Sequence, residues 1–327
     1  MAAHHQIALE PSIIDLRRAA VWELDPLLLQ ETVEWRQRLD WDYSKSADLV
    51  RKFTTTGSLA GAALVDVGTI VGYGYTVVEE HKGLIGDLYV RPELRGTRSE
   101  GRLFLALVQE LLNTPGVRRI ESQLLLVDRA TTLAVARDAG LRVYERTLML
   151  AGVEQLENRM PPCPVKGFRR ESFRLEPWGA QWSDAAAAVI TLAYRGHVDS
   201  EVNDQYRLFG AAAKFVNNLV DFPGCGTFHA ASSLVAIDRA TGRPAGIALC
   251  SFVAPGVGHV TQLCVSPEVR GQGLGYILLR EAIRRLAAAG AERLGLTVTL
   301  SNTAAMKLYH ACGLREVRRF FAYSKDI

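Results

Sequence analysis

The chain repeats one arrangement of residues, and this repeat limits the folds that it can adopt more than any other feature. Residues 89–96 (Tyr-Val-Arg-Pro-Glu-Leu-Arg-Gly) correspond to residues 263–271 (Leu-Cys-Val-Ser-Pro-Glu-Val-Arg-Gly). In both copies an amphipathic helix and a buried strand follow, and a Gly-Leu pair then lies at nearly the same distance, 39 residues after Gly101 and 38 residues after Gly275. A chain of 327 residues is long enough for two hydrophobic cores, so we expect two domains of one fold in tandem.

The second copy predicts a strand, a glycine-rich loop and a helix in direct succession. Residues 258–265 alternate in the manner of a strand, Pro267 ends the pairing, and residues 270–275 (Arg-Gly-Gln-Gly-Leu-Gly) lead into an apolar stripe at helical spacing. The first turn of a helix has unpaired N–H groups and partial positive charge, and glycines let the backbone close around an anion. We therefore expect this loop to bind a phosphate group. Tyr276-Ile277 stands where the Walker pattern needs Lys followed by Ser or Thr, and Tyr276 stands where the dinucleotide fingerprint needs a third glycine.

The remaining pattern, Arg270-x-x-Gly273-x-Gly275, resembles the R/Q-x-x-G-x-G/A signature of the GNAT N-acetyltransferase superfamily, whose loop binds the pyrophosphate of coenzyme A. Residues 302–314 are similar to the family's N-x-x-A-x-x-L-Y-x-x-x-G-F element, with Leu314 in place of the usual Phe. The resemblance implies an α/β (α+β) fold class: two tandem GNAT folds, each with a mixed, mostly antiparallel central sheet flanked by helices.

A proline-containing segment separates the two copies. Residues 154–171 contain Met-Pro-Pro-Cys-Pro and show no clear periodicity, and prolines favour an extended, stiff connection. We place the boundary near Val165 and expect a degenerate GNAT-like domain at residues 1–152, a linker at 153–171 and a catalytic domain at 172–327.

Helical spacing predicts helices at residues 13–30 and 32–39, interrupted at Asp25-Pro26, and turn residues bound the strands that follow. The expected strands and helices elsewhere are at residues 48–53, 59–66, 69–79, 84–90, 119–127, 173–176, 185–194, 206–220, 233–238 and 245–253.

The first copy departs from the motif at the positions that would approach a phosphate. Its loop is one residue longer and has Arg98 and Glu100 where small residues are needed, and Glu100 would place negative charge beside a pyrophosphate. Counted back from the Gly-Leu pair, the positions of Asn302 and Tyr309 are held by Arg129 and Ala136. We expect the first domain to have lost catalysis and to act as a lid or partner surface. Binding of a phosphate by Arg95 and Arg98 stays open.

The resemblance implies direct transfer of an acetyl group from acetyl-coenzyme A to an amine in a ternary complex. Tyr309 matches the family tyrosine that reaches the coenzyme sulfur, and a phenol with a pKa near 10 is protonated at neutral pH and can donate to the leaving thiolate. His259 is the candidate base, since strand alternation puts it on the same face as Thr261, Leu263 and Val265, and histidine titrates near neutral pH. Asp199, Glu201 and a water chain remain alternatives.

The loop at residues 195–204 corresponds to the family's acceptor-site loop and supplies candidate acceptor contacts in His197, Asp199 and Glu201. Cys264 points to the opposite face of its strand and is expected in the core rather than as a nucleophile. The predicted cofactor-binding residues are Leu263, Cys264, Val265, Arg270, Gly271, Gln272, Gly273, Leu274, Gly275 and Asn302.

Composition narrows the functional class. A formal net charge of +3 gives no reason to expect nucleic-acid or membrane binding, and five cysteines without a C-x-x-C pair argue against a metal site or a disulfide framework and favour a cytoplasmic protein. We expect an acetyl-coenzyme A-dependent N-acetyltransferase, with a small amine favoured as acceptor because the first domain would cover the cleft. Alternatives are a non-catalytic acyl-coenzyme A sensor or scaffold, which has no need of Tyr309, and a protein lysine or N-terminal acetyltransferase. Acceptor identity, acyl-chain preference and oligomeric state stay open.

Overall fold

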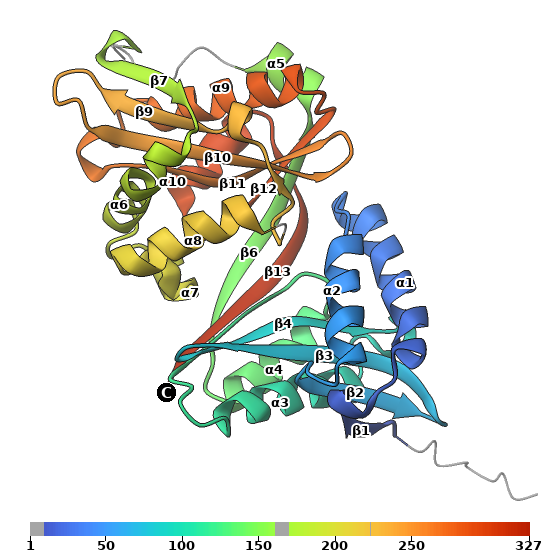
Figure 1. The fold of residues 1–327 in the computed structure, drawn as a ribbon. Helices are drawn as coiled ribbons and strands as arrows, with labels where there is room; N and C mark the ends of the chain where they lie inside the picture. The colour runs from blue at the N-terminus through green and yellow to red at the C-terminus, as the bar shows by residue number, and fades with distance from the viewer. Residues whose placement is uncertain (1–9, 161–169, 223) are drawn as a thin grey trace, which may run out of the picture. The chain divides into compact units, whose positions relative to one another are not determined.

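The computed structural model describes residues 10–160, 170–222 and 224–327. These residues form two compact units (Figure 1): the first contains residues up to 34, 46–144 and 320–327, and the second contains residues 35–45 and 145–319. The predicted division at residues 152 and 172 follows the repeat, whereas the compact units exchange short segments across it. Val165 and most of the predicted linker, residues 161–169, lie outside the described residues.

The first unit is a sheet with helices on both faces. Its strands follow the order β1-β2-β3-β4-β5-β13, and only β4 and β5 run parallel. The apolar side of α3 packs on one face, where a Cβ at Gly74 of β3 would lie 2.5 Å from Leu107. Tyr73, the neighbour of Gly74, points to the other face and donates from its hydroxyl to Glu31 of α1 over 2.6 Å. The elements are β1 (Ser12–Asp15), α1 (Val21–Leu39), α2 (Ser44–Thr55), β2 (Gly61–Asp66), β3 (Thr69–Glu79), β4 (Lys82–Val90), α3 (Arg98–Leu112), β5 (Arg119–Leu124) and α4 (Arg129–Asp138).

The second unit has the same plan. Its strands follow the order β6-β12-β11-β10-β9-β7, with β8 beside β10, and only β11 and β12 run parallel. Helices α9 and α10 pack on one face, and α6 and α8 pack on the other (Figure 1). The predicted fold class, a mixed and mostly antiparallel sheet flanked by helices, is confirmed. The elements are α5 (Val153–Arg159), β7 (Phe173–Pro177), α6 (Ser183–Ala193), α7 (Val198–Val202), α8 (Phe209–Asp221), β8 (Thr227–Phe228), β9 (Leu234–Asp238), β10 (Pro244–Ala254), β11 (Val257–Val265), α9 (Leu274–Ala288), β12 (Arg293–Thr299) and α10 (Thr303–Ala311).

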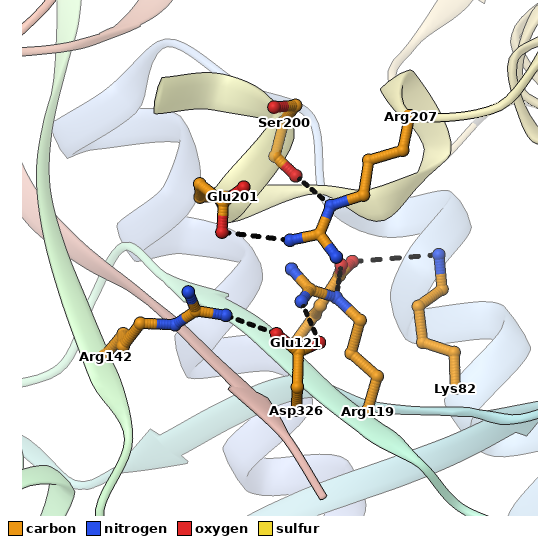
Figure 2. Close-up of polar contacts among 8 residues, drawn as sticks. All are labelled: Lys82, Arg119, Glu121, Arg142, Ser200, Glu201, Arg207 and Asp326. Atoms are coloured by element: carbon orange, nitrogen blue, oxygen red, sulfur yellow. Dashed lines mark hydrogen bonds and ion pairs between the residues drawn. The ribbon is translucent and has the colours of Figure 1, made fainter. Parts of the chain in front are cut away.

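Two long strands, β6 (Arg142–Gly152) and β13 (Arg315–Asp326), contribute to both units. Residues 146–152 of β6 pair with β12, and residues 321–326 of β13 pair with β5 of the first unit. An ion-pair network supports this last pairing (Figure 2): the buried Arg119 contacts the buried Glu121 and the half-exposed Asp326 at 2.5 Å each, and Arg142 also pairs with Asp326. The sequence analysis did not predict this exchange of strands.

The helix predicted at residues 13–30 is wrong at both its start and its interruption. Residues 12–15 form β1, and α1 begins at Val21 and continues through Pro26 to Leu39. Pro26 is the sixth residue of α1, so its ring removes one hydrogen bond, to the carbonyl of Trp22. Trp22 is 74% exposed, so the helix continues at the cost of one bond at a solvent-facing position. None of the helices in the described ranges combines the length and the apolarity that are needed to cross a membrane.

Candidate functional site

The second unit's sheet opens between its two parallel strands. Within the described residues, β11 and β12 pair only from Val257↔Arg293 to His259↔Gly295. Both strands continue past this point, β11 to Val265 and β12 to Thr299, with their other edges held by β10 and β6. Backbone groups on the facing edges of the two strands therefore have no strand partner beyond His259 and are available to an extended ligand.

The glycine-rich loop lies directly after β11, at the open end of the sheet. Gly271 and Gly273 have φ values of 72° and 92°, which only glycine adopts without strain, and Gly273 is the residue before the first turn of α9. A Cβ added at Gly275, the second residue of α9, would meet no atom within 4 Å. The first-turn N–H groups of α9 thus border open space, as an anion site requires.

Two predicted cofactor residues in this loop contact protein groups instead. The guanidinium of Arg270 donates to the carbonyl of Ala193 at the end of α6, and the Gln272 amide donates to the Glu268 carbonyl over 2.9 Å. Arg270 therefore ties the loop to α6, and its predicted contact with pyrophosphate stays a prediction.

A β-bulge at Thr261 overturns one sequence inference. Gln262 pairs with Leu249 while Val260 pairs with Cys250, so Thr261 is an extra residue without a partner in β10. Leu263 and Val265 pack toward α9, as Val260 also does. His259 therefore lies on the α6 and α8 face with Gln262 and Cys264, and its predicted placement with Leu263 and Val265 is wrong. Thr261 does lie near His259, because its hydroxyl donates to Ser251, the cross-strand partner of His259.

His259 is buried at the point where β11 and β12 part. Its ring makes an edge-on contact with Trp41 at 5.2 Å, and its Nδ1 would lie 3.4 Å from a Cβ at Gly295. Only 4% of the residue is exposed, and burial lowers the pKa of the imidazole to about 4. The ring is therefore neutral at neutral pH and is a weaker base than an exposed histidine.

We expect the burial of His259 to make stability depend on pH in a defined window. An imidazole of pKa about 4 when folded and about 6.5 when unfolded binds protons more readily in the unfolded chain. The free energy of unfolding should therefore fall as the pH falls from about 6.5 to about 4, by roughly 3 kcal/mol in full. Urea denaturation at pH 7.5 and pH 5 measures this slope.

His259→Asn should flatten that slope, because the substituted amide does not titrate in this range. An equal slope in wild type and His259→Asn would show that another group causes it.

Tyr309 and Asn302 lie on α10, which follows β12. Asn302 is the residue before the helix, and its Oδ1 accepts a hydrogen bond from the Ala305 N–H over 3.2 Å, so it fixes the start of α10. Tyr309 is 8% exposed, and its hydroxyl has no hydrogen bond among the described residues. Burial raises the pKa of the Tyr309 phenol above its usual value, and the nearby Asp199 and Cys264 add to the effect. The phenol is thus protonated at neutral pH and free to donate.

A buried polar cluster lies on the α6 and α8 face of the sheet. The Thr299 hydroxyl donates to Oδ1 of Asp199, whose Oδ2 lies 3.5 Å from His197 Nδ1. The Gln262 amide donates to the Tyr194 hydroxyl over 2.8 Å, and the rings of Tyr194 and Tyr206 stack at 4.5 Å. Of these residues, only Asp199 and His197 were candidates from the sequence. The signal that could have found the others is a polar side chain at an inward position of an otherwise apolar strand, as at Gln262 and Thr299.

Cys264 is buried among apolar residues of α6, α8 and β10, and burial raises the pKa of its thiol to about 12. This agrees with the prediction that it belongs to the core and is not a nucleophile.

Comparison with known proteins agrees with this geometry. Residues 219–314, which contain β11, the glycine loop and α10, match the model of the Acetyltransferase (GNAT) family. Residues 219–314 are thus similar to the GNAT acetyltransferase family. The predicted family resemblance is thereby confirmed.

Two solved structures share the GNAT fold over most of this chain. A GCN5-related N-acetyltransferase from Sphaerobacter thermophilus is 18% identical, with 81% of this chain and 80% of that chain covered and a TM-score of 0.56. A tandem GNAT protein from the clavulanic acid biosynthesis pathway is 16% identical, with 82% of each chain covered and a TM-score of 0.54. At these identities the likeness concerns the fold.

A curated relative is more similar over a shorter range. Mycothiol acetyltransferase from Tsukamurella paurometabola is 33% identical over 105 residues, which is 32% of this chain and 36% of that protein. The match therefore spans about a third of the relative's length.

The first unit's loop that corresponds to the glycine loop holds a carboxyl group of the chain itself, that of Glu100. This side chain is fully buried and accepts hydrogen bonds from the N–H of Gly96 over 2.8 Å and of Asp128 over 3.1 Å. Burial raises the pKa of the Glu100 carboxyl. Arg95, which was left open as a phosphate ligand, pairs with Glu34. One N–H of the loop, that of Gly96, and the side chain of Arg95 are therefore bonded to groups of the chain itself.

The counterpart of Asn302 in the first GNAT unit is Asp128 rather than Arg129. Asp128 precedes α4 and accepts from the Thr131 N–H over 2.9 Å, as Asn302 does for α10. Counting from the Gly-Leu pair gave Arg129 because α4 is one residue longer than α10.

A surface hollow and a search for metal ligands add no residues to the candidate site. A shallow hollow lined by Gln155, His310 and Arg315 lies at the far end of α10 from the glycine loop. Among the described residues, no group of three or more His, Cys, Asp or Glu side chains is arranged to hold a metal ion.

Proposed function

We propose that the protein is an N-acetyltransferase that moves the acetyl group of acetyl-coenzyme A to the amine of a small molecule by direct attack. The observation that carries this proposal is the parting of β11 and β12 with an open glycine loop at its end. Pantetheine would lie along the free edge of β11 at Leu263 and Val265, and the pyrophosphate would lie at the first turn of α9. Tyr309 would protonate the leaving thiolate.

Several features favour a small amine over the alternatives. The relative with the highest sequence identity reported above is named for acetylation of mycothiol, a small-molecule system, which supports a small acceptor. A buried phenol without a hydrogen-bond partner at the end of α10 is of use to a catalyst and not to a sensor or scaffold. A protein lysine or N-terminal acetyltransferase remains the second candidate, and the choice of amines in the test below separates the two.

We expect calorimetric titration with acetyl-coenzyme A to give one equivalent bound per chain. The second unit's loop is open at Gly275, whereas in the first unit's loop the Glu100 carboxyl group already accepts a hydrogen bond from the Gly96 N–H. Two equivalents would show that the first unit also binds the cofactor, and no binding would overturn the proposal.

Turnover is then measured by release of the coenzyme thiol with four acceptors: glucosamine, 2-phenylethylamine, spermidine and an N-acetylated Gly-Lys-Gly peptide. Turnover of one of the first three and not of the peptide supports a small-molecule enzyme. Turnover of the peptide alone supports the protein-directed alternative.

A further inference from the structure

Asp199 is a buried carboxylate with one oxygen left open. The residue is 8% exposed, and its Oδ1 accepts from the Thr299 hydroxyl. Its Oδ2 accepts no hydrogen bond from any residue in the described ranges, and its nearest basic atom is His197 Nδ1 at 3.5 Å. That nitrogen accepts a hydrogen bond from the Asp199 N–H over 3.2 Å. This oxygen is therefore open to a hydrogen-bond donor of a ligand.

The surroundings of Asp199 fit the reacting end of an amine. Asp199 is held by Thr299, the last residue of β12, and α10, which carries Tyr309, begins four residues later at Thr303. Asp199 also raises the pKa of the Tyr309 phenol, after the larger effect of burial. The stacked rings of Tyr194 and Tyr206 lie beside it, and Asp199 also raises the pKa of both phenols, after the larger effect of burial. Aromatic faces and a carboxylate together favour a cation.

The neighbouring carboxylate does not share these properties. Glu201, two residues further along α7, is 44% exposed at its side chain and pairs with Arg207 over 3.1 Å. The same guanidinium donates to the Ser200 carbonyl over 2.7 Å (Figure 2), so Glu201 and Arg207 form a surface pair that fixes α7. Of the two acidic candidates from the sequence, only Asp199 has an oxygen free for a ligand.

His259 lies far from this place. His259 pairs with Gly295 on β12. Thr299, which donates to Asp199, is four residues further along β12, and four residues of a strand span about 13 Å. The imidazole is therefore at the inner end of the parted strands, while Asp199 is beyond them.

We propose that Asp199 binds the ammonium group of the acceptor and takes its proton, so that the acceptor is a cationic primary amine. This inference rests on the proposed function and names the residue that selects and activates its second substrate. The affinity of the site for amines is expected to depend on the charge of Asp199, because the tyrosines and Gln262 are already bonded to one another.

The proton and electron transfers balance with the groups that are present. One N–H bond of the ammonium breaks, its proton passes to Asp199, and the nitrogen lone pair forms a C–N bond to the thioester carbonyl carbon. The C–S bond then breaks, the thiolate takes the phenolic proton of Tyr309, and the phenolate takes a second proton from the nitrogen. The products are an acetamide and the free coenzyme thiol, and Asp199 returns its proton to water.

The test measures amine binding separately from chemistry. The protein is saturated with coenzyme A, which cannot transfer an acetyl group, and is titrated at pH 7 with the same four amines. We expect at least one amine to bind the wild type and none to bind Asp199→Asn, which keeps the shape of the side chain and its contact with Thr299. Glu201→Gln, the same chemical change two residues away, should bind within about twofold of wild type, and both variants should bind acetyl-coenzyme A normally.

A merely structural role for Asp199 gives a different result. Thr299→Val removes the contact that fixes α7 to β12 but leaves the carboxylate, so amine binding should persist while thermal stability falls. Loss of amine binding in Thr299→Val together with Asp199→Asn would identify Asp199 as a structural contact and overturn the proposal. Failure of all four amines to bind the wild type, or binding that survives Asp199→Asn, would overturn it as well.

Turnover adds a second readout. In Asp199→Asn, kcat/KM should fall about 100-fold at pH 7 and then rise about tenfold per pH unit towards the pKa of the amine, because only the free base then reacts. A parallel pH profile in wild type and variant would contradict proton transfer to Asp199. Asp199-dependent binding of an amine without any thiol release would leave this inference standing and overturn the proposed function instead.

Discussion

Gly275→Glu is expected to weaken acetyl-coenzyme A binding at least 100-fold, or about 3 kcal/mol. The substituted carboxylate would stand in the open space at the second residue of α9, where the partial positive charge of the helix and its free N–H groups would otherwise meet the pyrophosphate. Since no atom lies within 4 Å of a Cβ at this position, the variant should fold normally. Calorimetric titration with acetyl-coenzyme A measures the loss.

The matched control is Gly210→Glu. Gly210 is the second residue of α8, in the same unit, and a Cβ there also meets nothing within 4 Å. The control should bind the cofactor as the wild type does. Undiminished binding in Gly275→Glu would place the cofactor somewhere other than this loop.

Tyr309→Phe is expected to lower kcat about 100-fold, in the range of effects of a missing general acid, and to change the KM for acetyl-coenzyme A by less than about threefold. The hydroxyl has no hydrogen bond among the described residues, so its removal should leave thermal stability within about 0.5 kcal/mol of wild type. Because burial raises the pKa of this phenol above its usual value near 10, kcat of the wild type should not decline from loss of the phenolic proton below about pH 10.

Tyr323→Phe serves as the control for Tyr309→Phe. Tyr323 is buried in the first unit and donates to the Thr132 hydroxyl over 2.7 Å, so its substitution should cost about 1 kcal/mol of stability and leave kcat unchanged. A Tyr309→Phe enzyme with full kcat would show that a solvent water or another group protonates the thiolate.

The fold was predictable because its markers are local. The glycine loop, the Asn302 cap and the Tyr309 helix each occupy a short stretch in which spacing and backbone conformation determine the structure. Because the first unit repeats this pattern, the same markers also predict its fold. Pro26 was misleading for the same reason, since its local effect as a helix breaker was outweighed by the remaining turns of α1.

The features that escaped prediction depend on pairs of residues that are distant in sequence. The bulge at Thr261 depends on the register between β10 and β11, and no residue type in β11 indicates where it lies. One extra residue was enough to put His259 on the opposite face of the sheet. The contact of Asp199 with Thr299 joins residues 100 positions apart, and it arises only when α7 packs on β12.

The exchange of strands between the units also constrains the order in which the chain can fold. A tandem protein usually folds its first domain while the second is still being synthesised. Here the edge of the first unit's sheet at β5 is completed by residues 321–326, and Arg119 finds its partner Asp326 there. During translation the first unit must therefore wait with an open edge strand and an incompletely paired arginine until the second unit has been made. We therefore expect a ribosome-bound first half to expose the edge of β5 and to bind chaperones.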